Sequence, residues 1–275
     1  MSMSIRTNVS SLNAQRNLYQ TQLQLDSSLS RLSSGYRITK AGDDAAGLGI
    51  SVNLESQIRS YNQAVRNAND GISLIQTAEA AMNEQSNILS RLRELAMQSA
   101  SDGIGNTERG YIQDEVVEQV AELERVAQAT EFNGQKLLDG SAATLEFQVG
   151  IRNVAANDRI TVTTVDATTA TLGVDTLDLS TKAGAQGALT TIDTALQTLS
   201  SARATLGAAG NRFTSAVASI QASSESLSAA NSRIRDVDVA EETSRMARSQ
   251  VLMQAGVAVL AQANQMPQIA LKLLG

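Results

Sequence analysis

The chain has 275 residues, a net charge of −6, one Pro, and neither His nor Cys. The missing His and Cys exclude His-based acid–base catalysis, thiol nucleophiles, disulfides and the usual zinc sites. The acidic charge, with only 3% aromatic residues, disfavours nucleic-acid binding, and the near absence of proline permits very long helices.

The N-terminal 35 residues show the apolar spacing of a helix. Residues 1–10 are polar and lack the apolar core of a conventional signal peptide. No stretch of the chain approaches the roughly 20 consecutive apolar residues of a membrane span. Composition alone therefore predicts a cytoplasmic protein. The apolar positions of this first helix are Ile5, Val9, Leu12, Tyr19, Leu23, Leu25, Leu29 and Leu32.

A long helix is predicted over about 44–99, with Asp43 or Asp44 as its N-cap. It carries two apolar seams, so it needs more than one neighbouring helix. A turn-like segment then leads into a further helix over about 107–129. Over about 141–183 the period changes to two, and Thr and Val become frequent, which predicts a β-hairpin. The alternating apolar residues are Leu145, Phe147, Val149, Ile160 and Val162.

The clearest periodicity lies in the predicted helix at about 186–234. Steps of four and three from Ile192 to Ile234 place large apolar side chains at nine of thirteen seam positions. This heptad pattern is typical of a coiled coil. Such a helix would be roughly 75 Å long, whereas a compact domain of this size would be about 50 Å across, so we expect a rod.

The last 40 residues carry apolar side chains on two tracks of one helix. A helix that is apolar on several sides needs burial on several sides. Pairing this helix with the first one would still leave apolar surface in water, so we expect burial in a polymer. The residues predicted to drive this assembly are Ile5, Val9, Leu12, Leu29, Leu32, Met253, Val257, Leu260, Leu271 and Leu274.

Candidate catalytic and metal-binding motifs are better explained by structure. Asp43 and Asp44 could act as metal or acid–base carboxylates, but a helix N-cap with a first-turn charge explains them. The run 69–71 (Asn-Asp-Gly) resembles a turn yet lies inside a helical seam, which favours a packing or polar contact feature. Spacing alone leaves a Ser–Lys dyad open, although nothing points to one. The sequence therefore predicts no enzyme activity, no cofactor, and no catalytic, cofactor-binding or metal-binding residue.

Nine short stretches together resemble the bacterial flagellins, in the family's order and from end to end. Each is weak alone, but the ordered set, with both termini included, is very specific. The stretches are 29–35 (LSRLSSG), 42–47 (GDDAAG), 66–73 (RNANDGIS), 92–99 (LRELAMQS), 112–115 (IQDE), 132–138 (FNGQKLL), 206–213 (LGAAGNRF), 232–238 (SRIRDVD) and 259–274 (VLAQANQMPQIALKLL).

The resemblance implies a mainly α, long-helix coiled-coil bundle with a small β-hairpin region and two discontinuous domains. The inner, filament-core domain would join residues 1–42 to residues 236–275, and the outer rod domain would span 43–235. Only about 40 residues separate the helical halves, so the family's variable outer domains are expected to be absent.

The resemblance also implies a structural subunit that polymerises into the flagellar filament for swimming. It replaces the cytoplasmic prediction with an extracellular one, because such subunits are exported unfolded by a type III apparatus without a cleaved signal peptide. The implied partners are copies of the chain, an export chaperone at the C-terminal segment, and the hook-associated junction and cap proteins. No nucleic acid and no membrane insertion are expected.

A host partner is implied as well. Flagellins of the immunostimulatory type bind the Toll-like receptor for flagellin through one face of the central helices. The matching positions here are Arg91, Leu95, Gln98 and Glu115. The first three fall at steps of four and three, so they are expected on one face of the helix. Ser90 departs from the Gln that is usual in receptor-binding members.

Three alternatives come from other classes of protein. A hook–filament junction (hook-associated) protein shares the terminal helices, but the motifs within 66–99 and 112–138 favour flagellin. A flagellin carrying a grafted enzyme domain would need more room than residues 141–183 provide. The third alternative is an intracellular coiled-coil scaffold. Electron microscopy of culture supernatant would distinguish it, because a flagellin forms micrometre-long helical filaments there and a scaffold would form none.

Overall fold

A computed structural model describes residues 7–141 and 144–274, and over 266–274 it describes the backbone alone. The described chain is mainly helical, with small antiparallel strand pairs, as the sequence predicted. Its contacts divide it into two units. Unit 1 comprises Met1–Ile58 with Glu225–Gly275, and unit 2 comprises Arg59–Ser224. The long helices α2 (Ala45–Ser99) and α6 (Lys182–Arg235) each contribute residues to both units.

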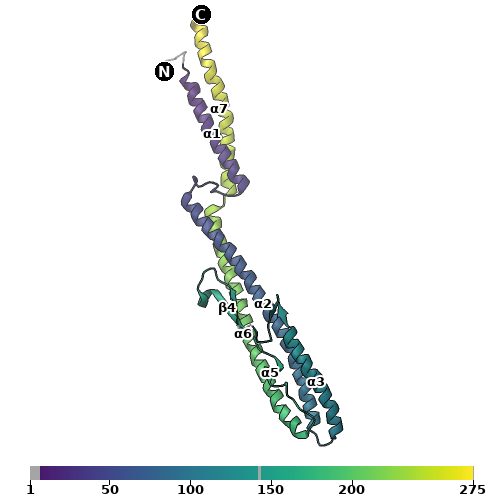
Figure 1. Cartoon of the computed structure of the whole chain (residues 1–275). Coiled ribbons are helices and arrows are strands. Elements are labelled where there is room, and N and C mark those ends of the chain that lie inside the picture. The colour runs from purple at the N-terminus through teal and green to yellow at the C-terminus, as the bar shows by residue number, and fades with distance from the viewer. Residues whose placement is uncertain (1–6, 142–143, 275) are drawn as a thin grey trace. The chain divides into compact units, whose positions relative to one another are not determined.

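Unit 1 contains a pair of antiparallel terminal helices, α1 (Val9–Ser34) and α7 (Val239–Leu274), which lie side by side in Figure 1. The side chain of Asn8 caps the start of α1 by accepting from the backbone N–H of Ser11. Gly35, at φ 74°, ends α1 in the left-handed conformation that a residue without a Cβ adopts at little cost. Both helix ends are therefore specified by local sequence.

The two connections between the helices of unit 1 are joined by backbone hydrogen bonds. The Arg37 N–H donates to the Arg235 carbonyl over 2.6 Å, and the Val237 N–H donates to the Gly35 carbonyl over 3.0 Å. An isolated antiparallel bridge pairs Tyr36 with Asp236 between them. Segments about 200 residues apart in sequence are thus held in one register.

Unit 2 packs α3 (Asn106–Ala129) and the short α5 (Thr169–Leu172) against the neighbouring stretches of α2 and α6, as Figure 1 shows. Its core is almost wholly aliphatic, as the composition predicted. The heptad prediction for α6 is confirmed from Ile192 to Ile220, where every seventh residue of the seam is buried, and Leu227 and Ile234 further along it are half-buried. The buried residues are Ile192, Leu199, Leu206, Phe213 and Ile220.

The β-hairpin consists of β3 (Thr144–Gln148) and β4 (Arg159–Thr163), which pair antiparallel. The short helix α4 (Ala155–Asp158) lies in the connector between them. Leu145 pairs with Val162 and Phe147 with Ile160, so the alternating apolar residues share one face of the hairpin. A second, two-residue pair, β1 (Glu131–Phe132) with β2 (Gln135–Lys136), was not predicted.

Candidate assembly surface

The seam between α1 and α7 alternates large and small side chains. On each helix the buried and half-buried positions recur at steps of three and four, as in a coiled coil. Only one large apolar residue per heptad faces the partner helix, and the remaining positions are mostly small or polar. The seam of α1 is Ser11, Ala14, Leu18, Thr21, Leu25, Ser28 and Leu32, and that of α7 is Glu242, Met246, Ser249, Met253, Gly256, Leu260 and Ala263.

Small seam residues bring the two backbones close together. A β-carbon added at Gly256 would lie 2.8 Å from Leu18 Cδ1, so Leu18 packs directly on the backbone of α7. The Asn8 amide nitrogen donates to the Ala263 carbonyl over 2.8 Å, and the Ser11 hydroxyl donates to Asn264 Oδ1 over 2.8 Å. The pairing of the terminal helices therefore depends on close approach and hydrogen bonds as well as on apolar burial.

The large apolar residues outside this seam point into solvent. Each of them is more than half exposed, and Tyr19 and Val251 are 66% and 65% exposed. An ordinary helical hairpin buries its large apolar residues and leaves small or polar ones outside. We call the following residues the outward apolar set: Val9, Leu12, Tyr19, Leu23 and Leu29 on α1, and Val239, Val251, Leu252, Val257 and Val259 on α7.

The predicted assembly residues divide between the seam and the outward apolar set. Leu32, Met253 and Leu260 are half-buried in the α1–α7 seam. Val9, Leu12, Leu29 and Val257 belong to the outward apolar set. Ile5 and the side chains of Leu271 and Leu274 lie outside the described residues. The predicted assembly residues therefore fall into two sets. One set packs within the α1–α7 hairpin, and the other is exposed and available to contact another molecule.

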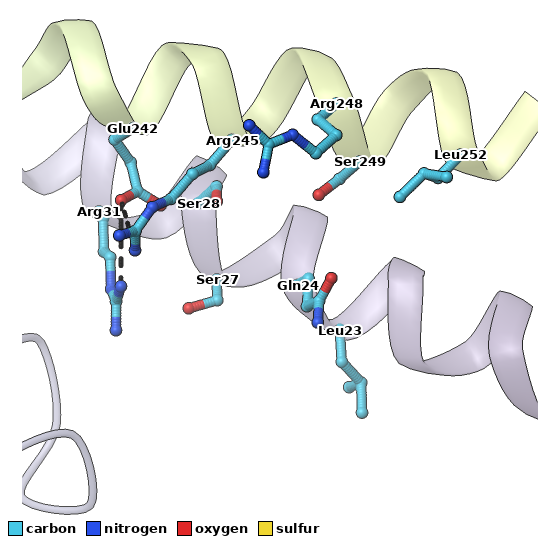
Figure 2. A pocket seen from close by; sticks show the side chains of 10 residues that line it. All are labelled: Leu23, Gln24, Ser27, Ser28, Arg31, Glu242, Arg245, Arg248, Ser249 and Leu252. Atoms are coloured by element: carbon cyan, nitrogen blue, oxygen red, sulfur yellow. Dashed lines mark ion pairs between the residues drawn. The ribbon is translucent and has the colours of Figure 1, made fainter.

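Charged residues join α1, α7 and the connection to α2. Glu242 on α7 is only 5% exposed, and its carboxylate lies 4.0 Å from an Arg31 guanidinium nitrogen and 3.9 Å from one of Arg245. Figure 2 shows both ion pairs as dashed lines. Arg31 also lies 3.8 Å from Asp43. The buried charge of Glu242 therefore has two cationic neighbours, as a charge removed from water requires.

The two consecutive acids before α2 have structural roles. Asp44 is the N-cap of α2, since its Oδ1 accepts from the Gly47 N–H over 2.8 Å. Asp43 Oδ2 accepts from the backbone N–H and the hydroxyl of Thr39 and from the Lys40 N–H. These hydrogen bonds, those of Thr39 first, lower the pKa of Asp43, and Arg31 adds a smaller effect. Over the described residues, no group of three or more His, Cys, Asp or Glu could hold a metal ion.

The predicted receptor-binding residues lie in unit 2, where two of the four are exposed and Glu115 is half-buried. Arg91 and Gln98 are exposed on α2, and Glu115 is close to Arg91 on α3. One carboxylate oxygen of Glu115 accepts from Nε and Nη2 of Arg91 at 3.0 and 2.8 Å. Leu95, in contrast, is only 2% exposed and belongs to the core of unit 2. Its prediction as a surface contact was wrong, because α2 turns this side chain toward the interior.

The terminal hairpin of α1 and α7 is thinly packed, and its outward apolar set is exposed. These features define a class of protein: a long-helix subunit that can bury this apolar surface against further molecules. Residues 5–143 match the family model described as bacterial flagellin N-terminal helical region, and residues 189–274 match bacterial flagellin C-terminal helical region. The chain belongs to the bacterial flagellin family.

Full-length relatives agree with this assignment. A flagellin of Halalkalibacterium halodurans is 43% identical over 272 residues, covering 99% of this chain and 100% of that protein. The flagellar filament 33 kDa core protein of Treponema phagedenis is 41% identical over 288 residues, with coverage of 99% and 100%. The crystal structure of Bacillus cereus flagellin aligns with a TM-score of 0.51 and 34% identity, over 56% of this chain and 88% of that one. The chain is therefore a structural subunit of a flagellar filament, and the hook-associated alternative is not favoured.

No helix in the described ranges combines the length and the apolar character that crossing a membrane would require.

Proposed function

We propose that this chain forms the flagellar filament by burying its outward apolar set against neighbouring copies. The observation that carries the proposal is the distribution of side chains on α1 and α7: their seam holds only one large apolar residue per heptad, whereas the outward apolar set is more than half exposed. Fully burying a Val or Leu side chain stabilises an assembly by about 1.5–3 kcal/mol. Several such residues on each copy can together offset the entropy lost when a subunit is immobilised.

The terminal helices would then form an inner domain of the filament, made of residues 1–42 and 236–275. Residues 43–235 would form the outer domain. These boundaries coincide with the non-helical breaks between α1 and α2 and between α6 and α7. The contact-based unit 1 is larger, because it also includes the start of α2 and the end of α6. In this proposal the hydrogen-bonded connections around Tyr36 and Asp236 mark the boundary of the inner domain.

Export and assembly partners follow from the same chemistry. Exposed Val and Leu side chains on α7 would need cover before assembly, which suits an export chaperone at the C-terminal segment. Hook-associated junction and cap proteins would contact the same kind of terminal helix at the two ends of the filament. The proposed location is an extracellular filament, reached by export without a cleaved signal peptide. The proposed role is structural, without catalysis or a cofactor.

A host Toll-like receptor is the further proposed partner, with Arg91, Gln98 and Glu115 as its contacts. A well-ordered Arg presented beside a carboxylate is a common centre of a protein–protein interface. Arg91 has both Glu115 and Glu94 as ion-pair partners, at 2.8 and 3.1 Å, so its guanidinium is held in one position on the surface.

Polymerisation of the full-length chain tests the filament proposal. In the double variant Leu12→Gln, Val257→Gln, two residues of the outward apolar set become polar without entering the α1–α7 seam. We expect the critical concentration for filament growth, measured by sedimentation and electron microscopy, to rise at least tenfold. The control is Val154→Gln, which changes an exposed residue just before α4. Equal polymerisation of the double variant and wild type would contradict the proposal.

A further inference from the structure

An open pocket lies between α1 and α7 within unit 1. Its volume is about 450 Å³, and Figure 2 shows the ten side chains that line it. Three of the lining residues are arginines, Arg31, Arg245 and Arg248, whereas Glu242 is the one carboxylate among them. The lining therefore carries an excess of positive charge in a chain whose net charge is −6.

The unpaired positive charge of the pocket lining belongs to Arg248. Arg31 pairs with Glu242 and Asp43, and Arg245 pairs with Glu242 and Glu241. Arg248 has no carboxylate within ion-pair distance in the part of the chain that the structure describes. Both guanidinium contacts of Glu242 are made to its Oε2, from Arg31 and Arg245, and neither involves Arg248. Arg248 is thus an exposed cation at a pocket whose other charges are matched.

The pocket is continuous with the outward apolar set. Leu23 and Leu252 line the pocket and are each 51% exposed. Asp26 follows Leu23 by three residues on α1, and its side chain accepts only from the amide of Gln22, at 2.9 Å, among the described residues. The same surface therefore carries apolar residues, an unpaired cation and an unpaired carboxylate. Such a surface allows the cation of one copy to face a carboxylate of the next, as in the head-to-tail contacts that build a helical filament.

We propose that the pocket receives a carboxylate of a second copy of this chain, which pairs with Arg248 while apolar residues of the two copies cover the rim. This rests on the proposed filament function and specifies one of its contacts. Apolar burial around the pair would remove water and strengthen the ion pair. Because the contact also aligns opposite charges, it would select one register among the many that apolar side chains alone permit.

Carbodiimide cross-linking tests the contact directly. This reagent joins a carboxylate to an amine only when the two are in contact, so the variant Arg248→Lys supplies the amine and keeps the charge. Filaments are grown from an equal mixture of ¹⁵N-labelled and unlabelled subunits of this variant and are digested for mass spectrometry. We expect cross-linked peptides of mixed isotope content that contain position 248, in filaments and not in monomers. Filaments with no such peptide, or with same-isotope links only, would overturn the proposal.

Charge reversal gives an independent measurement. We expect Arg248→Glu to raise the critical concentration at least tenfold at low salt, with the helical content of the monomer unchanged. The matched control is Arg152→Glu, which reverses another exposed arginine that has no ion pair among the described residues. Equal critical concentrations for Arg248→Glu and wild type would overturn the proposed contact. Failure of the wild-type chain to polymerise would instead contradict the filament function, and this inference with it.

Discussion

The ring of Phe213 on α6 occupies the space that any side chain at Gly71 on α2 would need, because a β-carbon added at Gly71 would lie 2.6 Å from Phe213 Cζ. Phe213 is fully buried, and its ring meets that of Phe147 edge to face, with centroids 5.4 Å apart. Gly71 thus allows two helices and the β-hairpin to meet around one aromatic residue. The sequence 69–71, which resembles a turn, lies within α2, and Gly71 has a packing role there, one of the two roles that its position in a helical seam predicted.

We predict that Gly71→Ala destabilises the chain by about 1–3 kcal/mol, since overpacking would force Phe213 from its position. The matched control is Gly207→Ala in α6, where an added β-carbon would meet nothing within 4 Å. That control should stabilise the helix by about 0.5–1 kcal/mol, because alanine has the higher helix propensity. Urea unfolding followed by circular dichroism measures both changes. A stabilised Gly71→Ala variant would contradict the packing argument.

The heptad repeat of α6 could be predicted because one seam holds large residues over many turns, and the core of unit 2 buries that seam. The orientation of α1 could not be predicted in the same way. Its more apolar track, which includes Leu12, Tyr19 and Leu23, faces solvent, whereas the α1–α7 seam alternates large and small residues. Periodicity reveals that a helix has apolar tracks, but it does not reveal whether each track packs within the chain or against another molecule.

Leu95 illustrates a second limit. Steps of four and three place Arg91, Leu95 and Gln98 on one side of α2, yet at about 100° per residue Leu95 lies about 40° from Arg91. That rotation is toward Leu92 and Ala96, both of which are fully buried. A residue at the edge of an exposed face can therefore belong to the core, and how the neighbouring elements pack against the helix decides whether it does.

The small β1–β2 pair has a turn signal in its sequence, although it has no apolar periodicity. Asn133 and Gly134 both have positive φ, at 50° and 79°, as a two-residue hairpin turn of the Asn-Gly type requires. The strands on either side are only two residues long, so no alternation of apolar and polar residues could develop.

For the proposed receptor contact, we predict that Arg91→Ala with Glu115→Ala reduces receptor activation by monomeric protein severalfold or more. Arg91 is exposed and Glu115 is only half-buried, so the folded core should persist. The control is Arg125→Ala with Glu122→Ala, which removes another exposed Arg–Glu pair, on α3 alone. A receptor-reporter cell assay measures the response. Equal loss in both double variants would mean that the effect is not specific to the Arg91 surface.

The loop before α2 should respond to acid through Asp43. Hydrogen bonds from Thr39 and Lys40 to its carboxylate lower its pKa, so the ionised form stabilises the fold. This contribution is fully present above the ordinary Asp pKa of about 3.9 and is lost as the pH falls below it, through the lowered folded-state pKa. NMR titration of the Thr39 and Lys40 amide shifts in wild type should report that low midpoint. In Asp43→Asn the amide titration should disappear, and its persistence would assign the effect to another group.

Removing both terminal segments should separate folding from polymerisation. We predict that a chain lacking residues 1–40 and 236–275 is soluble and helical but forms no filament. It retains α2, α3 and α6 with the core cluster of unit 2, so the buried aliphatic side chains that stabilise that unit remain. It loses α1 and α7, and with them every member of the outward apolar set and the pocket at Arg248.

In the full-length monomer, the thin seam between α1 and α7 should make their amides exchange faster than those of α6. Circular dichroism, sedimentation and hydrogen exchange measure these outcomes. Filaments grown from the trimmed chain at wild-type concentrations would show that the terminal helices do not carry assembly.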